Sequence, residues 1–122
     1  MTEQPKDIKA RAYLYALRII QFIDGLDKKE WSVEVIVKQL LRSATSVGAN
    51  IIEAQAGSSK KDFINFLSHA LKSANESKFW LGLLRDSKKC ASEKANSLLK
   101  ETNEVANILG ASVATLKGKR KL

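Results

Sequence analysis

The sequence predicts an all-α protein, an up-down-up-down antiparallel bundle of four helices. Four long segments repeat apolar residues at alternating spacings of four and three, which is the period of a helix and not of a strand. The connections between these segments are short and polar, and short connections place successive helices antiparallel. A further observation concerns the second segment, which is apolar around most of its circumference and therefore needs cover beyond its own bundle.

The ends of the four segments carry residues that start or stop helices. Gly57 closes the second segment, as glycine commonly does after a helix. Ser59 with Asp62 resembles a capping box at the start of the third, and Ser32 and Ser92 can cap the second and fourth. We expect one domain, residues 1–116, with helices near residues 6–25, 32–56, 59–85 and 91–116, followed by a basic flexible tail of residues 117–122.

Length and composition describe a basic single-domain protein of 122 residues. No apolar run approaches the ~18 residues of a membrane span, and the polar N-terminus does not resemble a signal peptide. We therefore expect a cytoplasmic protein with no membrane partner. The 21 lysine and arginine residues exceed the 13 acidic residues by eight. Such a charge favours phosphate backbones or acidic surfaces, although it also serves solubility alone.

The second segment predicts contact between subunits. Outside its core stripe it still carries valine, isoleucine, leucine and alanine, and only four of its residues are charged. An exposed apolar patch of this size would promote aggregation of a single bundle, so we expect a second copy to cover it. Small residues in the same segment would allow a close approach. The expected oligomer interface consists of Leu41, Gly48, Ala49 and Ile52.

A polar pair interrupts this apolar segment. Asn50 and Glu53 lie three residues apart, on one face of a helix, and Ser73 and Glu76 repeat the spacing in the third segment. A buried glutamate without partners would be strongly destabilising or become neutral. We therefore expect a hydrogen-bonded cluster that fixes helix register or oligomer state. Its expected members are Arg42, Asn50, Glu53, Ser73 and Glu76.

The same residues carry a resemblance to a known family. The stretches "QLLRSATSVGANIIEA" and "SSKKDFINFLSHALKSANES" resemble the 23S rRNA intervening-sequence proteins, closely over residues 35–85 and by helical pattern outside them. The matching positions of the first block are Leu41, Arg42, Ser46, Val47, Asn50, Ile51 and Glu53. Those of the later blocks are Phe63, Phe66, Leu67, Ala70, Ser73 and Glu76. Ala54 stands where the family usually has glycine.

The resemblance implies a four-helix bundle that assembles as a cyclic homo-oligomer, usually a pentamer. Members of the family are encoded within intervening sequences of bacterial ribosomal RNA genes or elsewhere in genomes. Similar accessory proteins of retroelements bind nucleic acid and a reverse transcriptase. The resemblance thus makes further copies of the chain, RNA or DNA, and a protein such as a reverse transcriptase the candidate partners.

Candidate catalytic groups are few, and we expect neither an enzyme nor a cofactor or metal site. His69 is the only histidine, so zinc motifs and a Ser-His-Asp triad lack their parts. Glu53 and Glu76 could pair as carboxylates, but the Glu-x-x-His motifs of a di-metal bundle are absent. Cys90 stands alone, which excludes an intrachain disulfide, and the adjacent lysines could lower its pKa.

Basic residues concentrate at one end of the expected bundle. The second connection and both termini would lie at that end, and a ring would multiply its charge. We expect it to bind nucleic acid, RNA in the first place, through phosphate contacts. The candidate residues are Lys60, Lys61, Lys117, Lys119, Arg120 and Lys121. The alternative is a protein-interaction scaffold or accessory subunit that touches no nucleic acid, and Trp31 and Trp80 are interpreted as core or interface anchors in either case.

Overall fold

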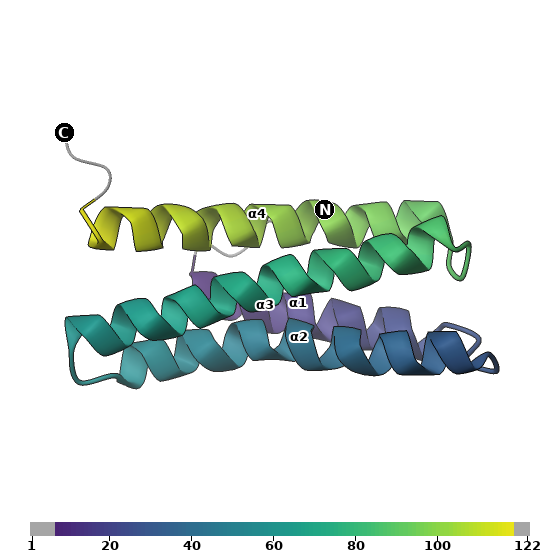
Figure 1. Cartoon of the computed structure of the whole chain (residues 1–122), viewed down its shortest axis with the longest axis horizontal. Coiled ribbons are helices and arrows are strands. Elements are labelled where there is room, and N and C mark those ends of the chain that lie inside the picture. The colour runs from purple at the N-terminus through teal and green to yellow at the C-terminus, as the bar shows by residue number, and fades with distance from the viewer. Residues whose placement is uncertain (1–6, 119–122) are drawn as a thin grey trace.

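The computed structural model describes residues 7–118 and folds them into four helices without a strand. The helices are α1 (Ile8–Asp24), α2 (Trp31–Ala56), α3 (Lys60–Asp86) and α4 (Ser92–Leu116), and their bounds differ from the expected ones by at most two residues. All four lie roughly along one axis (Figure 1). The α2–α3 connection is at one end, and the other two connections are at the opposite end.

Neighbouring helices form a closed circuit of contacts. α2 packs against α1 and α3, while α4 packs against α3 and, less extensively, against α1. In the second predicted helix, every apolar residue at the alternating spacings of four and three, from Val33 to Ala54, is buried. The buried residues form two clusters, one in each half of the bundle. The alternating-spacing pattern therefore located the core correctly.

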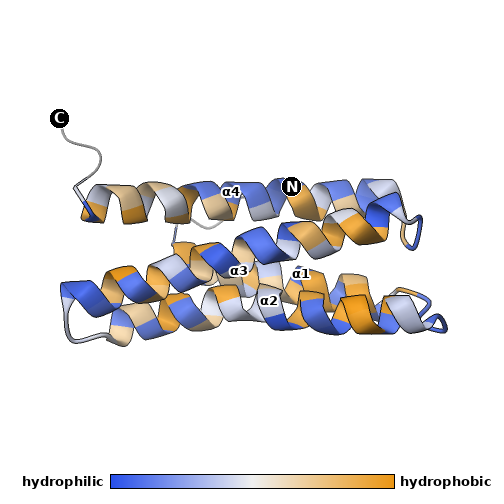
Figure 2. Cartoon of the chain, viewed as in Figure 1, coloured by the Kyte–Doolittle hydropathy of each residue, from blue (hydrophilic) through white to orange (hydrophobic). Residues whose placement is uncertain are grey.

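Hydrophobic and hydrophilic residues alternate along each helix, as expected of amphipathic helices with one side toward a core (Figure 2). Of the helices that the structure describes, none is both long and apolar enough to cross a membrane.

Two of the expected helix caps are present and two are wrong. The Ser59 side chain accepts a hydrogen bond from the Asp62 backbone N–H at 3.1 Å and starts α3. Gly57 follows the last residue of α2. Ser32 and Ser92, in contrast, lie inside the first turns of their helices, because Glu30 and Ala91 occupy the N-cap positions.

Polar contacts join α1 to α4. The Arg11 guanidinium donates to both carboxylate oxygens of the buried Glu101, at 2.7 and 2.9 Å, and to Glu104 at 2.8 Å. These bonds, that to Glu101 first, raise the pKa of Arg11. One turn further along α1, the Tyr15 hydroxyl bonds the Thr102 hydroxyl at 2.7 Å. Thr102 itself donates to the Leu98 carbonyl, so Tyr15 is the donor, and burial raises the pKa of Tyr15.

α1 is much the shortest helix. It has 17 residues, whereas the other three have 25 to 27. At 1.5 Å per residue, α1 is shorter than α4 by about 12 Å. Near the α2–α3 connection the bundle is therefore built from three helices (Figure 1).

Replacing Glu101 by glutamine tests the ion pair that fastens α1. We expect Glu101→Gln to lower the free energy of unfolding by about 3 kcal/mol, because the half-buried Arg11 loses its buried counter-charge. Glu104→Gln removes a carboxylate from the same guanidinium, but the Glu104 side chain is 48% exposed, and we expect a loss below about 1 kcal/mol. Urea unfolding at one fixed protein concentration measures both. Equal losses would contradict this account.

Candidate assembly and binding surfaces

The outer surface of α1 and α2 is apolar. We define the α1–α2 face by its exposed members, Tyr13, Leu14, Leu17, Ile20, Leu41, Ala49 and Ile52. Tyr13 is 65% exposed and Ile52 is 52% exposed. Contiguous apolar surface of this kind marks an interaction site on a protein of this size.

Charges are missing from this face for a structural reason. Between Ala10 and Gln21, α1 has two charged residues, Arg11 and Arg18. Arg11 turns to Glu101, and Arg18 donates to the Ser97 hydroxyl of α4 at 2.7 Å. Both arginines thus lie on the side of α1 that contacts α4, and the outside of α1 carries no charge between Ala10 and Gln21, with Lys9 at its N-terminal end.

A groove of about 680 Å³ runs along the α1–α2 face, between the two helices. Of the predicted interface residues, Ala49 and Ile52 are exposed in this groove, and Leu41 is exposed on α2 without lining it. Gly48 is half-buried: a Cβ built on it would lie 3.6 Å from the Cβ of Ala12. That distance is an ordinary van der Waals contact, so Gly48 packs on Ala12 of α1 within one chain, besides lining the groove.

The contribution of α1 to this face was not predicted. The signal was present in "AYLYALRIIQF", residues 12–22, which contains one charge in three turns of helix. The same argument that was applied to the second helix would have identified it.

A second apolar area, separate from this face, lies on α2 and α3 toward the α1–α2 connection. We call it the α2–α3 patch and define it by its exposed members, Trp31, Val35, Phe79 and Leu83. The Phe79 ring packs edge-on against Trp80 at a centroid distance of 5.0 Å. Trp80 is partly buried against the core, whereas Trp31 is 77% exposed and is no core anchor.

The predicted polar cluster exists as two smaller groups between α2 and α3. Arg42 pairs with Glu76, which also accepts a hydrogen bond from the Trp80 indole at 3.0 Å. Separately, Asn50 and Ser73 both donate to the Ser46 hydroxyl at 2.9 Å. The pattern did not reveal Ser46, although its spacing of four from Asn50 places it on the same face.

Beside this second group, the buried hydroxyls of Ser43 and Ser77 share a hydrogen bond of 2.8 Å. Small hydroxyl residues thus line the contact of α2 with α3. Their side chains form hydrogen bonds either within one helix or between the two helices.

Glu53 does not belong to the cluster. Its side chain is exposed, and the hydrogen bonds found within residues 7–118 include none to it. The expectation of an internal glutamate is therefore wrong for the single chain, and water solvates the carboxylate instead.

The predicted basic end is partly described. Lys60 and Lys61 begin α3, and Lys117 follows α4 at the same end of the bundle (Figure 1). All three are exposed, and within the described part of the chain none forms an ion pair. Lys119, Arg120 and Lys121 lie outside the described residues.

Two cations at the opposite end have acidic partners. Lys89 pairs with Glu30 at 2.7 Å, and Arg85 pairs with Asp86 at 2.9 Å. The hydrogen bond from Arg85 lowers the pKa of Asp86. Lys29, Lys88 and Lys94 of the same half form no ion pair within the described residues, so lysines without an acidic partner lie at both ends of the bundle.

The remaining reactive groups are dispersed. His69 is exposed on α3. Burial raises the pKa of the Cys90 thiol, so the lowering that its two neighbouring lysines suggested is not found. Within residues 7–118, no three histidine, cysteine or acidic side chains gather closely enough to hold a metal ion.

Taken together, four helices with an uncovered apolar face and an unpaired basic end define a small helical-bundle protein whose prominent surfaces are suited to binding. The profile of the 23S rRNA-intervening sequence protein family matches residues 5–111, and the chain belongs to that family. The resemblance carried by residues 35–85 is thereby confirmed and extended.

A solved structure supports the same membership. The chain is similar to a crystal structure from Bacteroides thetaiotaomicron, described as a protein with unknown function from the S23 ribosomal protein family. The two share 38% sequence identity and a TM-score of 0.81, over 88% of this chain and 98% of that one. Among curated proteins, none matches this chain.

Proposed function

We propose that the protein is a non-catalytic, cytoplasmic subunit of a homo-oligomeric ring that binds nucleic acid, RNA in the first place, through its basic ends. In this proposal each chain is an up-down-up-down bundle that meets its neighbours through the α1–α2 face. The observation that carries the proposal is that the exposed members of this face are apolar and that Lys9 is the one charged residue lining its groove, so a single bundle would expose apolar surface to water.

Two separate apolar areas favour a ring over a symmetric pair. A two-fold dimer needs one self-complementary patch, whereas a ring joins one patch of each subunit to a different patch of the next. The α1–α2 face and the α2–α3 patch lie on different sides of the bundle and can serve as these two surfaces. Five copies is the number that the family resemblance implies.

Nucleic-acid binding rests on the unpaired lysines. Within residues 7–118, Lys60, Lys61 and Lys117 have no acidic partner to displace before they contact a phosphate. Of the exposed aromatic residues, Trp31 and Phe79 lie in the other half of the bundle, and Tyr13 belongs to the α1–α2 face that this proposal assigns to assembly, so base stacking is not expected to accompany these contacts. Binding through the backbone alone is weakly sequence-specific and strongly salt-dependent.

A second candidate function is a protein-interaction scaffold or accessory subunit, for instance of a reverse transcriptase, that does not touch nucleic acid. An open apolar groove beside α4 favours this alternative.

Charged substitutions on the α1–α2 face test assembly. We expect Leu17→Asp and Ile52→Asp to raise the dissociation constant of the oligomer at least tenfold, because each would bury a carboxylate without a partner. Asn103→Asp, on the exposed side of α4, makes the same charge change and should leave assembly intact. Light scattering after size-exclusion chromatography reports the masses, and circular dichroism confirms that the variants are helical. Unchanged masses for both face variants would refute this interface.

Removal of the unpaired lysines tests the basic end. Replacing Lys60, Lys61 and Lys117 by glutamine should weaken RNA binding and reduce the salt slope by about two, since each phosphate contact contributes roughly 0.7–0.9. The matched control replaces Lys29, Lys88 and Lys94, which removes the same charge from the opposite half. Fluorescence anisotropy with generic RNA and duplex DNA over a salt series gives both slopes. Absence of binding at low salt, or equal slopes for the two triple variants, would exclude this site.

A further inference from the structure

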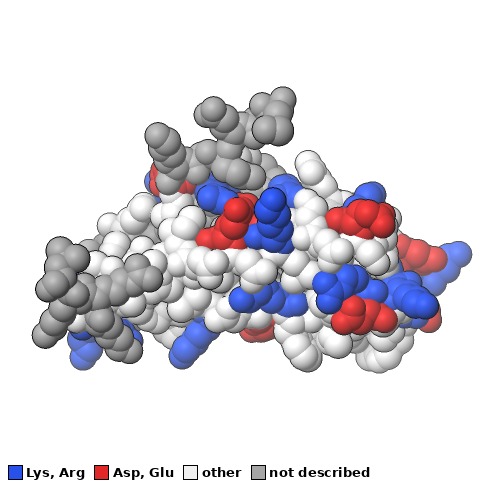
Figure 3. All heavy atoms as spheres, turned by 90° about the horizontal axis from the view of Figure 1, so that it is seen from above, with Lys and Arg blue, Asp and Glu red and all other residues white. Residues whose placement is uncertain are grey.

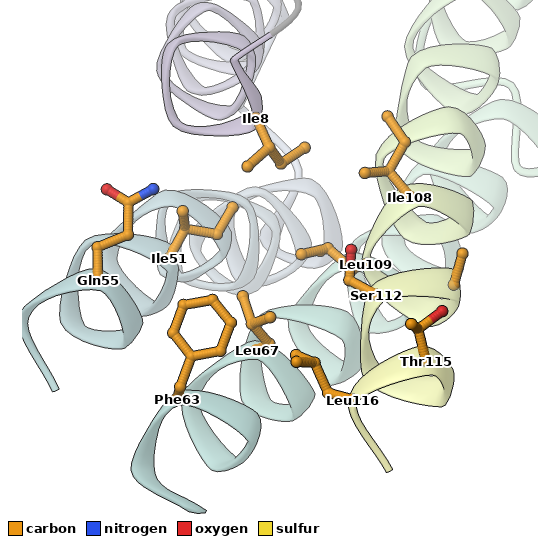
Figure 4. A pocket seen from close by; sticks show the side chains of 11 residues that line it. Ile8, Ile51, Gln55, Phe63, Leu67, Ile108, Leu109, Ser112, Thr115 and Leu116 are labelled. Carbon is orange, nitrogen blue, oxygen red and sulfur yellow. The ribbon is translucent and has the colours of Figure 1, made fainter. Parts of the chain in front are cut away.

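An open apolar groove of about 470 Å³ lies at the end of the bundle where α1 has not begun (Figure 4). Phe63 and Leu67 of α3 form its floor. Gln55 of α2 and Ile108 of α4 lie on its two sides, and Ile8 lies at the end where α1 starts. It is distinct from the groove between α1 and α2.

The groove exists because α1 is short. Elsewhere in the bundle α1 occupies the space between α2 and α4, but it starts at Ile8 while α4 continues to Leu116. The stretch of α4 that lines the groove, residues 108–116, is about 12 Å long at 1.5 Å per residue. The open space therefore has the position and length of two to three turns of a fourth helix.

The adjoining half of α4 is suited to a covered environment. Residues 105–116 contain no charged side chain, whereas residues 92–104 contain five. Viewed from the α4 side, the surface is charged over the N-terminal half of the helix and almost uncharged over the C-terminal half (Figure 3). A helix face that stays in water normally carries charges, so this half is adapted to a partner.

We propose that this groove binds a short amphipathic helix from another protein, whose apolar stripe packs on Phe63 and Leu67 and whose flanks are acidic. A helix is the shape that completes the bundle, and helix-in-groove binding uses one apolar stripe of this kind. Acidic flanks follow from the exposed cations beside the groove. Lys60 and Lys61 precede Phe63 within one turn, with the exposed Asp62 between them and Phe63, and Lys117 directly follows Leu116, so lysines outnumber carboxylates at these positions by three to one. This inference does not depend on the proposed ring or on RNA binding.

The chain itself supplies no good occupant. In a second copy, each helix is packed against its neighbours in its own bundle. None of these helices can therefore lie along the groove, which α1 closes at one end. An apolar stripe needs apolar residues at positions i, i+3, i+4 and i+7. Too few apolar residues for such a stripe are present in residues 1–6, "MTEQPK", and in residues 117–122, "KGKRKL". Phosphate groups would gain nothing from the apolar floor.

The test uses a fluorescent twelve-residue peptide with a leucine stripe and glutamate flanks, added to the full-length protein. We expect saturable binding by anisotropy, and at least tenfold weaker binding of the same peptide with lysine flanks. Thr115→Trp places a large side chain at the groove and should weaken binding at least tenfold. Asn107→Trp, exposed on α4 but not lining the groove, should leave it unchanged. Ile108→Glu provides a second groove variant.

Several outcomes would overturn the proposal. These are no saturable binding, equal binding by Thr115→Trp and the unmodified protein, or equal binding of both peptides. If Ile108→Glu and Thr115→Trp change the oligomer mass, the groove is occupied by a second copy instead. If deletion of residues 2–6 strengthens peptide binding, the chain's own N-terminus is the occupant. If RNA displaces the peptide from the unmodified protein but not from the groove variants, the occupant is nucleic acid.

Discussion

Both arginines in the middle of α1 turn toward α4. Arg11 pairs with the buried Glu101, and Arg18 bonds Ser97, so these side chains hold α1 on α4. The same arrangement removes charge from the outside of α1, where tyrosine, leucine and isoleucine remain in contact with water. The orientation of Arg11 and Arg18 toward α4 thus bears both on the folding of one chain and on its proposed association with others.

The surfaces of the bundle are separated in space. Apolar residues cover α1 and α2, unpaired lysines lie near the α2–α3 connection, and the shortness of α1 leaves the groove beside α4. The proposed contact with further copies uses side chains of its own, whereas phosphates and the acidic flanks of a helical partner would meet the same three lysines, Lys60, Lys61 and Lys117. The α2–α3 seam of serines and Asn50 is internal to the chain and needs no partner.

The sequence predicted the helices and the core well, because apolar periodicity reports directly which side of a helix is buried. It also identified the family, through Asn50, Glu53 and the blocks that follow them. It failed at Glu53 and at the thiol of Cys90, since exposure and pKa depend on how neighbouring helices are rotated and packed. It could not show the groove, which arises from where α1 starts relative to the end of α4.

The central claim is that a single bundle cannot leave the α1–α2 face in water. Sedimentation velocity of the unmodified protein, from submicromolar to tens of micromolar concentration, measures this most directly. The account predicts one discrete species several times heavier than the 13.5 kDa chain, persisting across that range. A well-behaved 13.5 kDa monomer at every concentration would contradict it.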